Sequence, residues 1–255
     1  MKKFMCVAAG LVLFLGACTK DDPALTGNDD DTKDTSQTVS VTSADGSTVK
    51  GNVVNLKFDT KNIEIIKADG DVTGKTGHIH VFVDRDAAQV GDVIPKEPGI
   101  IHTDQPELQV TGLSVGSHTF LAVLGDGTHK ALSPASKVTV TVGGPSVQAT
   151  PPPTIAAGAA FNIDLKVEGV TIVAADADTS GKTGHLHVLI DPEKPPTADG
   201  VALAKVEGKI IHTTATSVPI PGLTAGEHVL FVLVGDGNHV PLSPLVMHRI
   251  VVTVT

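Results

Sequence analysis

Two short segments of the chain carry histidines two positions apart, His78-Ile79-His80 and His185-Leu186-His187. On a β-strand, side chains at positions i and i+2 lie on the same face, about 6.6 Å apart along the strand. Metal–nitrogen bonds of about 2.0–2.1 Å allow one ion to bridge two such imidazoles. Each segment is therefore a candidate half of a transition-metal site. The same pattern is also typical of two ordinary histidines on a polar strand face.

Further histidines follow a Gly-Asp-Gly sequence, which is typical of a hairpin turn, in both halves of the chain. If the strand with the paired histidines runs antiparallel to the strand that ends in Gly-Asp-Gly, the later histidine lies beside the pair. The predicted ligands are His78, His80 and His129 for one site and His185, His187 and His239 for the other. His102 and His212 are candidate fourth ligands.

A structural role is favoured over a ligand role for His118 and His228. Each follows a Leu and a Gly at the point where a β-sandwich turns from its fifth strand into its sixth. Many sandwiches hold a Tyr there, and its hydroxyl bonds back to the backbone, as a histidine can. The antiparallel arrangement also places Asp84 near His118.

The ligand chemistry limits the metal. Imidazoles without thiolates suit Cu(II), Zn(II) or Ni(II), so Cu or Zn is the expected cofactor. Cys6 and Cys18 are the two cysteines, and Met247 is the one methionine beyond the N-terminal segment. This composition disfavours thiolate or thioether sites, disulfides and a cysteine nucleophile in the domains. A small non-metal ligand and a purely structural role for the histidines are the alternatives.

The histidine motifs recur in the same order in two halves, so the chain is a duplicated domain. Hydrophobic residues make up 41% of the chain, which contains no Tyr or Trp, so Val, Ile, Leu and Thr must fill the core. The predicted class is all-β, with two tandem immunoglobulin-like antiparallel β-sandwiches over residues 38–142 and 155–255. Predicted strands of the first copy cover residues 38–43, 52–58, 78–84, 99–103, 107–111, 118–125 and 137–142.

The N-terminal segment has the features of a bacterial lipoprotein signal. Residues 1–17 combine two lysines with an apolar run, and Leu15-Gly16-Ala17-Cys18 resembles a lipobox. This resemblance implies cleavage before Cys18 and its acylation. The polar residues 18–37 are expected to form a disordered tether, and residues 143–154 a Gly/Pro linker. Thr19 favours the outer membrane, with the domains facing the periplasm or the cell surface.

The formal net charge of −9 argues against nucleic acid as a partner. No nucleophile motif or paired-carboxylate arrangement stands out, which favours a non-enzymatic role. The leading hypothesis is a metal- or small-ligand-binding module of the envelope. One alternative is a non-catalytic structural or interaction protein with an envelope partner. The other is a metalloenzyme resembling superoxide dismutase, by analogy of fold.

The combined motifs resemble the bacterial domain-of-unknown-function family 4399. They are Gly-His-x-His followed by apolar residues and an Asp, a later His, Gly-x-His, and Gly-Asp-Gly-x-His. The resemblance covers both copies, over most of residues 40–255. It implies an envelope location and supplies no activity. Members of that family often carry three consecutive histidines, whereas this chain has Ile79 and Leu186 at the middle position.

Overall fold

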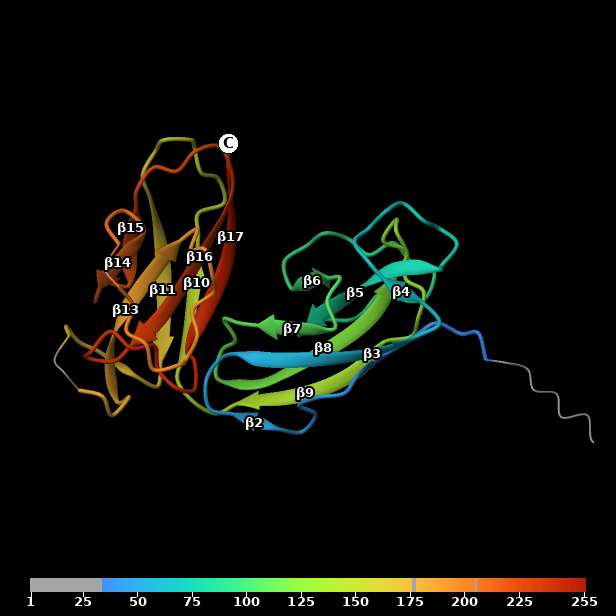
Figure 1. Cartoon of the computed structure of the whole chain (residues 1–255), viewed down its shortest axis with the longest axis horizontal. Coiled ribbons are helices and arrows are strands. Elements are labelled where there is room, and N and C mark those ends of the chain that lie inside the picture. The colour runs from blue at the N-terminus through green and yellow to red at the C-terminus, as the bar shows by residue number, and fades with distance from the viewer. Residues whose placement is uncertain (1–33, 176–177, 205) are drawn as a thin grey trace, which may run out of the picture. The chain divides into compact units, whose positions relative to one another are not determined.

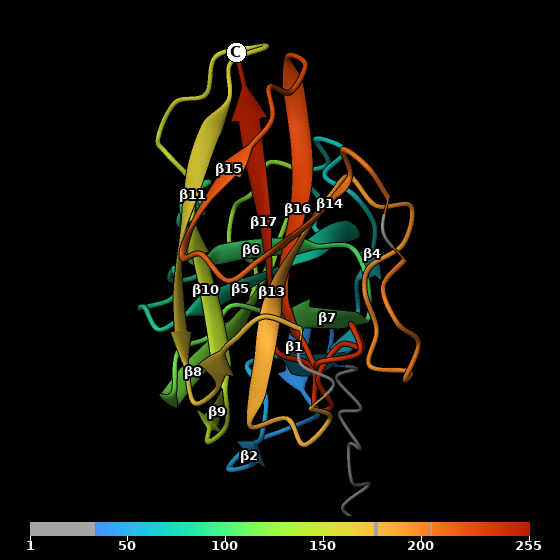
Figure 2. The same cartoon turned by 90° about the vertical axis from the view of Figure 1, so that its left-hand side faces the viewer.

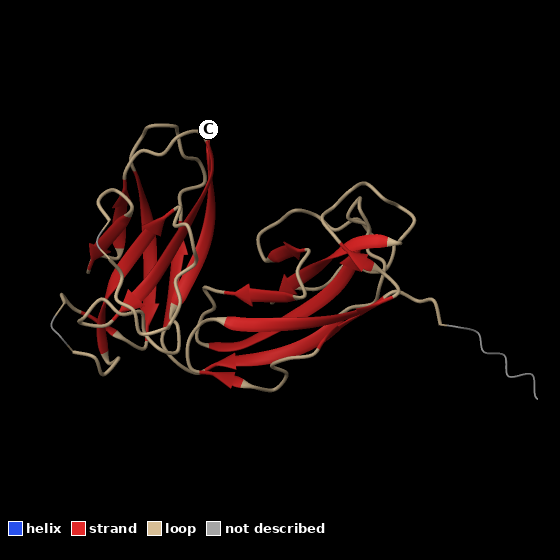
Figure 3. Ribbon diagram, in the orientation of Figure 1, coloured by secondary structure: helices blue, strands red, loops and turns tan. Residues whose placement is uncertain are grey.

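A computed structural model describes residues 34–175, 178–204 and 206–255. These residues form β-strands and loops without a helix (Figures 1 and 3). Within these ranges, no helix has the length and apolar character required to cross a bilayer. The predicted signal peptide, Cys18 and most of the predicted tether lie outside the described residues.

Each repeat is built from a three-stranded sheet and a larger sheet. In the first repeat the smaller sheet has the order β1 (Thr38–Val41), β3 (Val54–Lys61) and β7 (Glu107–Val110). The larger sheet has the order β2 (Thr48–Val49), β9 (Ser136–Val142), β8 (Gly116–Gly125), β5 (Thr76–Val83) and β4 (Glu64–Ile65), and β6 (Ile100–Thr103) also pairs with β5.

The second repeat follows the same plan. Its smaller sheet has the order β10 (Ser146–Thr150), β11 (Phe161–Glu168) and β15 (Ser217–Ile220). Its larger sheet has the order β12 (Thr171–Ile172), β13 (Thr183–Ile190), β16 (Gly226–Gly235) and β17 (Met247–Val254), and β14 (Ile210–Thr213) pairs with β13. Figure 2 shows β13, β16 and β17 side by side.

The predicted all-β sandwich class is confirmed. Each strand predicted in the first copy is present, with ends that differ by a few residues. The two-residue strands β2 and β4 were not predicted, because two residues carry no hydrophobic period. They pair parallel to β9 and β5, whereas the longer strands pair antiparallel.

One face of each larger sheet packs against the smaller sheet. Leu56, Ile79 and Phe120 are fully buried in the first core, as are Ile163, Leu186 and Leu230 in the second. Alternation along β5 and β13 accounts for this face, since every second residue points toward the core. Aliphatic side chains and Phe therefore fill cores that contain no Tyr or Trp.

The opposite face of β5 and β8 is also buried. Phe82, Ile100 and Val123 from three strands of the sheet pack there with Ile94 and Ala131 from loops, so these loops cover this side of the sheet. His78 and His80 lie on this covered face, and their residues are 3% and 0% exposed. The histidine strand is therefore enclosed on both faces.

The predicted linker over residues 143–154 is wrong for part of its length. Residues 146–150 form β10, which pairs with β11 in the smaller sheet of the second repeat. Val147 and Ala149 alternate toward the core, where they are buried. The glycines and prolines on either side obscured this five-residue strand in the sequence.

Candidate metal centre

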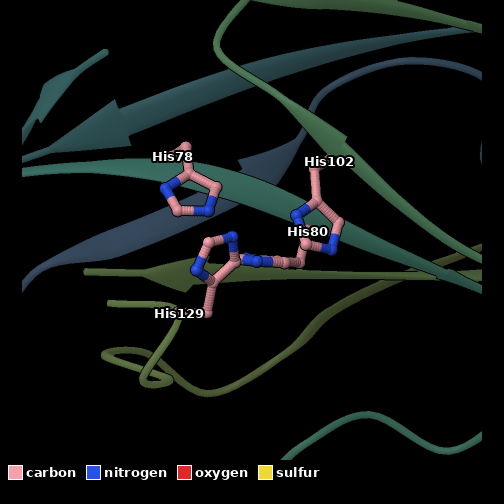
Figure 4. A group of neighbouring side chains, drawn as sticks. All are labelled: His78, His80, His102 and His129. Atoms are coloured by element: carbon pink, nitrogen blue, oxygen red, sulfur yellow. The ribbon is translucent and has the colours of Figure 1, made fainter. Parts of the chain in front are cut away.

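In the first repeat, neighbouring strands bring four histidines together. His78 and His80 lie on the covered face of β5, and His102 lies directly opposite His80 on β6. Gly125, at the end of β8, lies opposite His78, and His129 follows in the next turn. Figure 4 shows these four imidazoles gathered around a common centre. The predicted convergence of His78, His80 and His129 is present, and His102 joins them.

The spacing of the rings suits a single ion. The centroid of the His80 ring is 4.4 Å from that of His78 and 4.3 Å from that of His102. One ring nitrogen from each of the four residues lies within 4.8 Å of the others. With metal–nitrogen bonds of about 2.0–2.1 Å, nitrogens around a tetrahedral ion are about 3.3 Å apart. Small ring rotations would thus bring all four nitrogens to one ion.

The second repeat repeats the arrangement with three close nitrogens. Nδ1 of His239 lies 2.9 Å from Nε2 of His185 and 3.4 Å from Nε2 of His187, close to the tetrahedral spacing. The centroid of the His212 ring is 4.5 Å from that of His187 and 4.7 Å from that of His239. The ligand atoms of His185, His187 and His239 all lie within 4.8 Å of one another, and His212 is outside this group. His212, the predicted fourth ligand, is therefore the outermost of the four histidines.

Several of these ring nitrogens have no hydrogen-bond partner in the described part of the chain. This holds for both ring nitrogens of His78 and of His80, which are buried. Nε2 of His102 and Nδ1 of His187 are likewise buried without a hydrogen-bond partner in the described residues. A buried polar group without a partner costs about 1–3 kcal/mol, and folded proteins contain few of them. A ligand that binds several imidazole nitrogens at once would remove this cost.

Burial keeps the central imidazoles neutral. Desolvation, together with the neighbouring histidines, lowers the pKa of His78 to about 4 and the pKa of His80 to about 2. The same causes lower the pKa of His187 to about 3. Because the neutral imidazole is the form that binds a metal, these rings are competent ligands at neutral pH.

The metal-free protein is expected to lose stability as the pH falls below 6.5. In the unfolded chain His78 gains a proton near pH 6.5, whereas in the folded protein it does so only near pH 4. The unfolded chain therefore binds more protons in this interval, and the free energy of unfolding decreases, by at most about 1.4 kcal/mol per pH unit for one group. Urea denaturation of chelator-treated protein at about pH 7.5 and about pH 5 measures this change. Equal stability at both values would contradict it, and His78→Leu should flatten the slope.

A glycine lies against the innermost histidine of each cluster. A Cβ atom at Gly125 would overlap Cε1 of His80, and one at Gly235 would overlap Cε1 of His187. Neither glycine has a positive φ, so the backbone conformation does not require glycine there. Space for the imidazole explains both glycines, in addition to the turn that the Gly-Asp-Gly motif indicates.

The substitution Gly125→Ala is therefore expected to lower metal affinity by roughly 10–100-fold while leaving every ligand in place, as other changes that misalign a ligand do. Competition with a chromophoric chelator measures the affinity. Gly46→Ala is the control, because a Cβ at Gly46 meets no atom within 4 Å, although its φ of 67° makes alanine strained. Unchanged affinity in Gly125→Ala would show that the His80 ring does not need this space.

A buried aspartate shapes the turn that carries the last histidine. One carboxylate oxygen of Asp126, Oδ1, accepts hydrogen bonds from the backbone N–H groups of Thr128 and Lys130. His129 follows with a φ of 67°, and His239 occupies the equivalent position with a φ of 64°. Histidine is one of the few residues besides glycine that adopt this left-handed conformation comparatively often, so the turn accommodates a histidine at both positions.

His118 and His228 have the predicted structural role. Nδ1 of His118 lies 2.6 Å from a carboxylate oxygen of Asp84, as predicted, and Nε2 lies 2.8 Å from the carbonyl oxygen of Ser114. His228 makes the same two contacts with Asp191 and Thr224, and the hydrogen bond to Asp191 raises its pKa. Both nitrogens therefore face acceptors. These contacts do not form an Asp–His–Ser catalytic triad. Nε2 of His118, which would have to act as the base, already faces the carbonyl oxygen of Ser114.

His248, which has no counterpart in the first repeat, is also accounted for. Its Nδ1 accepts a hydrogen bond of 2.8 Å from the backbone N–H of Ala149, which joins β17 to β10. Burial lowers its pKa to about 4. Of the eleven histidines, eight therefore surround the two candidate centres and three have structural contacts of their own.

The fold and these clusters define a duplicated β-sandwich protein with two groups of histidines that could hold metal ions. The chain belongs to the family described as Domain of unknown function (DUF4399), which matches residues 56–143 and 163–255. The predicted family and its two tandem copies are thereby confirmed. No curated protein matches the chain.

Solved structures that match the chain include the fibronectin(III)-like modules of Clostridium thermocellum CbhA, with 15% identity and a TM-score of 0.26, covering 85% of this chain and 93% of that one. A tetra-tandem repeat of a large adhesion protein has 14% identity and a TM-score of 0.26, covering 86% and 49%. A putative membrane anchored protein from Corynebacterium diphtheriae has 14% identity and a TM-score of 0.27, covering 85% and 53%. The chain thus spans about half the length of the latter two. None of these scores is high enough to transfer a property to this chain.

Proposed function

We propose that each repeat binds one transition-metal ion, Cu(II) or Zn(II), and that the protein is a metal-binding lipoprotein of the cell envelope. The observation that carries the proposal is the group of buried, neutral imidazoles in the first repeat. Both ring nitrogens of His78 and of His80 lack hydrogen-bond partners in the described chain, and two further histidines face the same point.

The donor set selects the class of metal. Imidazole nitrogens suit Cu(II) and Zn(II), whereas Ca²⁺ and Mg²⁺ require oxygen ligands. The buried carboxylate nearest in sequence to His129 is Asp126, and it already accepts hydrogen bonds from its own turn. Neutral imidazoles do not reduce the positive charge of a bound ion. The net negative charge of the chain offsets it only at a distance.

The proposed location rests on the N-terminal sequence. Acylation of Cys18 would attach the chain to a membrane by lipid, and Thr19 favours the outer membrane. The polar residues that follow Cys18 would separate the two repeats from the bilayer surface. If the protein were instead a non-catalytic structural or interaction protein of the envelope, binding of its envelope partner would be indifferent to substitution of the clustered histidines.

Metal content tests the proposal. The full chain, purified in detergent without a histidine tag, is loaded with Cu(II) or Zn(II) and dialysed, and the metal is counted by mass spectrometry. We expect two ions per chain, and one ion in either His78→Ala/His80→Ala or His185→Ala/His187→Ala. His228→Ala is the matched control and should retain two ions, because His228 lies outside both clusters. Metal-free protein, or unchanged content in both double variants, would refute the proposal.

A further inference from the structure

A cavity of about 230 Å³ lies beside the histidine cluster of the first repeat. His78, His102 and His129 line it, whereas His80 does not. An ion held by the four histidines would therefore have the buried His80 on its inner side. Water and small ligands would approach the ion from the cavity. A cavity of this volume has room for several molecules of water size, since a liquid water occupies about 30 Å³.

Two charged residues also line this cavity. Lys67 follows β4 and is exposed, and Asp104 follows β6 and is half-buried. The Asp104 carboxylate accepts a hydrogen bond of 2.9 Å from Gln105. A bound divalent ion would make the cavity attractive to an anion, with the charge of Lys67 assisting and that of Asp104 opposing.

The second repeat lacks both charges. Pairing of Ile65 with Gly77 on β4 and β5 corresponds to pairing of Ile172 with Gly184 on β12 and β13. The position two residues further along is Lys67 in the first copy and Ala174 in the second. In the recurring Ile-Ile-His-Thr motifs, the next residue is Asp104 in the first copy and Thr214 in the second. The ligand histidines are thus duplicated, whereas the charged rim is not.

We propose that Cu(II) in the first repeat, which accepts ligands beyond the four histidines, keeps an exchangeable coordination position facing this cavity, where it binds a small monovalent anion assisted by Lys67. This inference rests on the proposed function, since the ion supplies one of the two positive charges. Open positions of this kind distinguish reactive or ligand-binding metal sites from closed structural ones.

Azide is the probe, because it is a small monovalent anion whose binding to Cu(II) gives a charge-transfer absorption band. Cu(II) is the suitable ion, since imidazole sites bind it more tightly than Zn(II). The full chain is prepared with one site at a time, using His185→Ala/His187→Ala to keep the first site and His78→Ala/His80→Ala to keep the second. Absorption and electron paramagnetic resonance titrations then give the azide affinity of each Cu(II) site.

Lys67→Gln should weaken azide binding at the first site by about fivefold without changing the copper content. Lys137→Gln, which removes the same charge from β9, should have no effect. Asp104→Asn should tighten azide binding, and Ala174→Lys should improve binding at the second site. Both charge effects should weaken with added salt.

The outcomes separate the two proposals. A chain that binds no copper refutes the metal function itself. A first site that binds copper but shows no azide band, or whose azide affinity is unchanged in both Lys67→Gln and Asp104→Asn, refutes the anion position while the metal function stands.

Discussion

Saturation with Cu(II) or Zn(II) is expected to raise the thermal unfolding midpoint of each repeat by roughly 15 °C or more. A ligand that binds only the folded state, at a thousand times its Kd, adds about 4 kcal/mol to the free energy of unfolding. For a domain of about 100 residues, each kcal/mol shifts the midpoint by roughly 4–8 °C. Differential scanning calorimetry of the full chain, with metal and then with excess chelator, measures the shift and its reversal.

The two repeats provide an internal control for this effect. In His78→Ala/His80→Ala, the transition of the second repeat should still move with metal, whereas that of the first should not. Mg²⁺ at the same concentration should leave both transitions in place, because imidazole nitrogens are poor ligands for it. A shift of equal size with Mg²⁺ would indicate a general ionic effect and contradict specific binding.

The second large effect concerns the metal-free protein, which His80→Leu is expected to stabilise by about 1–3 kcal/mol while abolishing metal binding in that repeat. His80 is fully buried with both ring nitrogens unpartnered in the described chain, and leucine fills similar space without a polar atom. Replacement of an unsatisfied polar group by an apolar one removes its desolvation cost. Urea denaturation in the presence of chelator measures the change.

The same substitution at His118 should have the opposite sign. His118→Leu leaves the Asp84 carboxylate and the Ser114 carbonyl without their imidazole partner and should destabilise the first repeat by about 1–2 kcal/mol. Metal content should remain at two ions per chain. If His80→Leu also destabilised the metal-free protein, the clustered histidines would be structural residues, and the proposed function would lose its main support.

Much of the candidate centre follows from strand periodicity alone. Two-residue alternation predicts that His78 and His80 share a face, and an antiparallel neighbour that ends in Gly-Asp-Gly places His129 beside them. The contact of His118 with Asp84 follows from the same antiparallel register. These predictions depend on local geometry and on one pairing of strands that is common in sandwiches.

Other features depend on tertiary contacts that no local pattern contains. His102 was only a candidate ligand, because its register opposite His80 is decided by the pairing of β6 with β5. Burial of the histidine face depends on a cover that includes Ile94 and Ala131, from loops without regular periodicity. The space that Gly125 leaves for the His80 ring likewise could not be predicted from the sequence, because it depends on the pairing of β8 with β5.

The ligands of the first centre come from three separate segments of the repeat, β5, β6 and the turn after β8. An ion held there would cross-link positions about fifty residues apart, and closing a long loop reduces the entropy of the unfolded chain. The described part of the chain contains no cysteine, so disulfides cannot serve this purpose there. Binding of the ion would therefore stabilise the folded repeat, and removal of the ion would reverse this effect. The repeats would then resist proteolysis and mechanical extension where metal is plentiful, and unravel more readily where it is scarce.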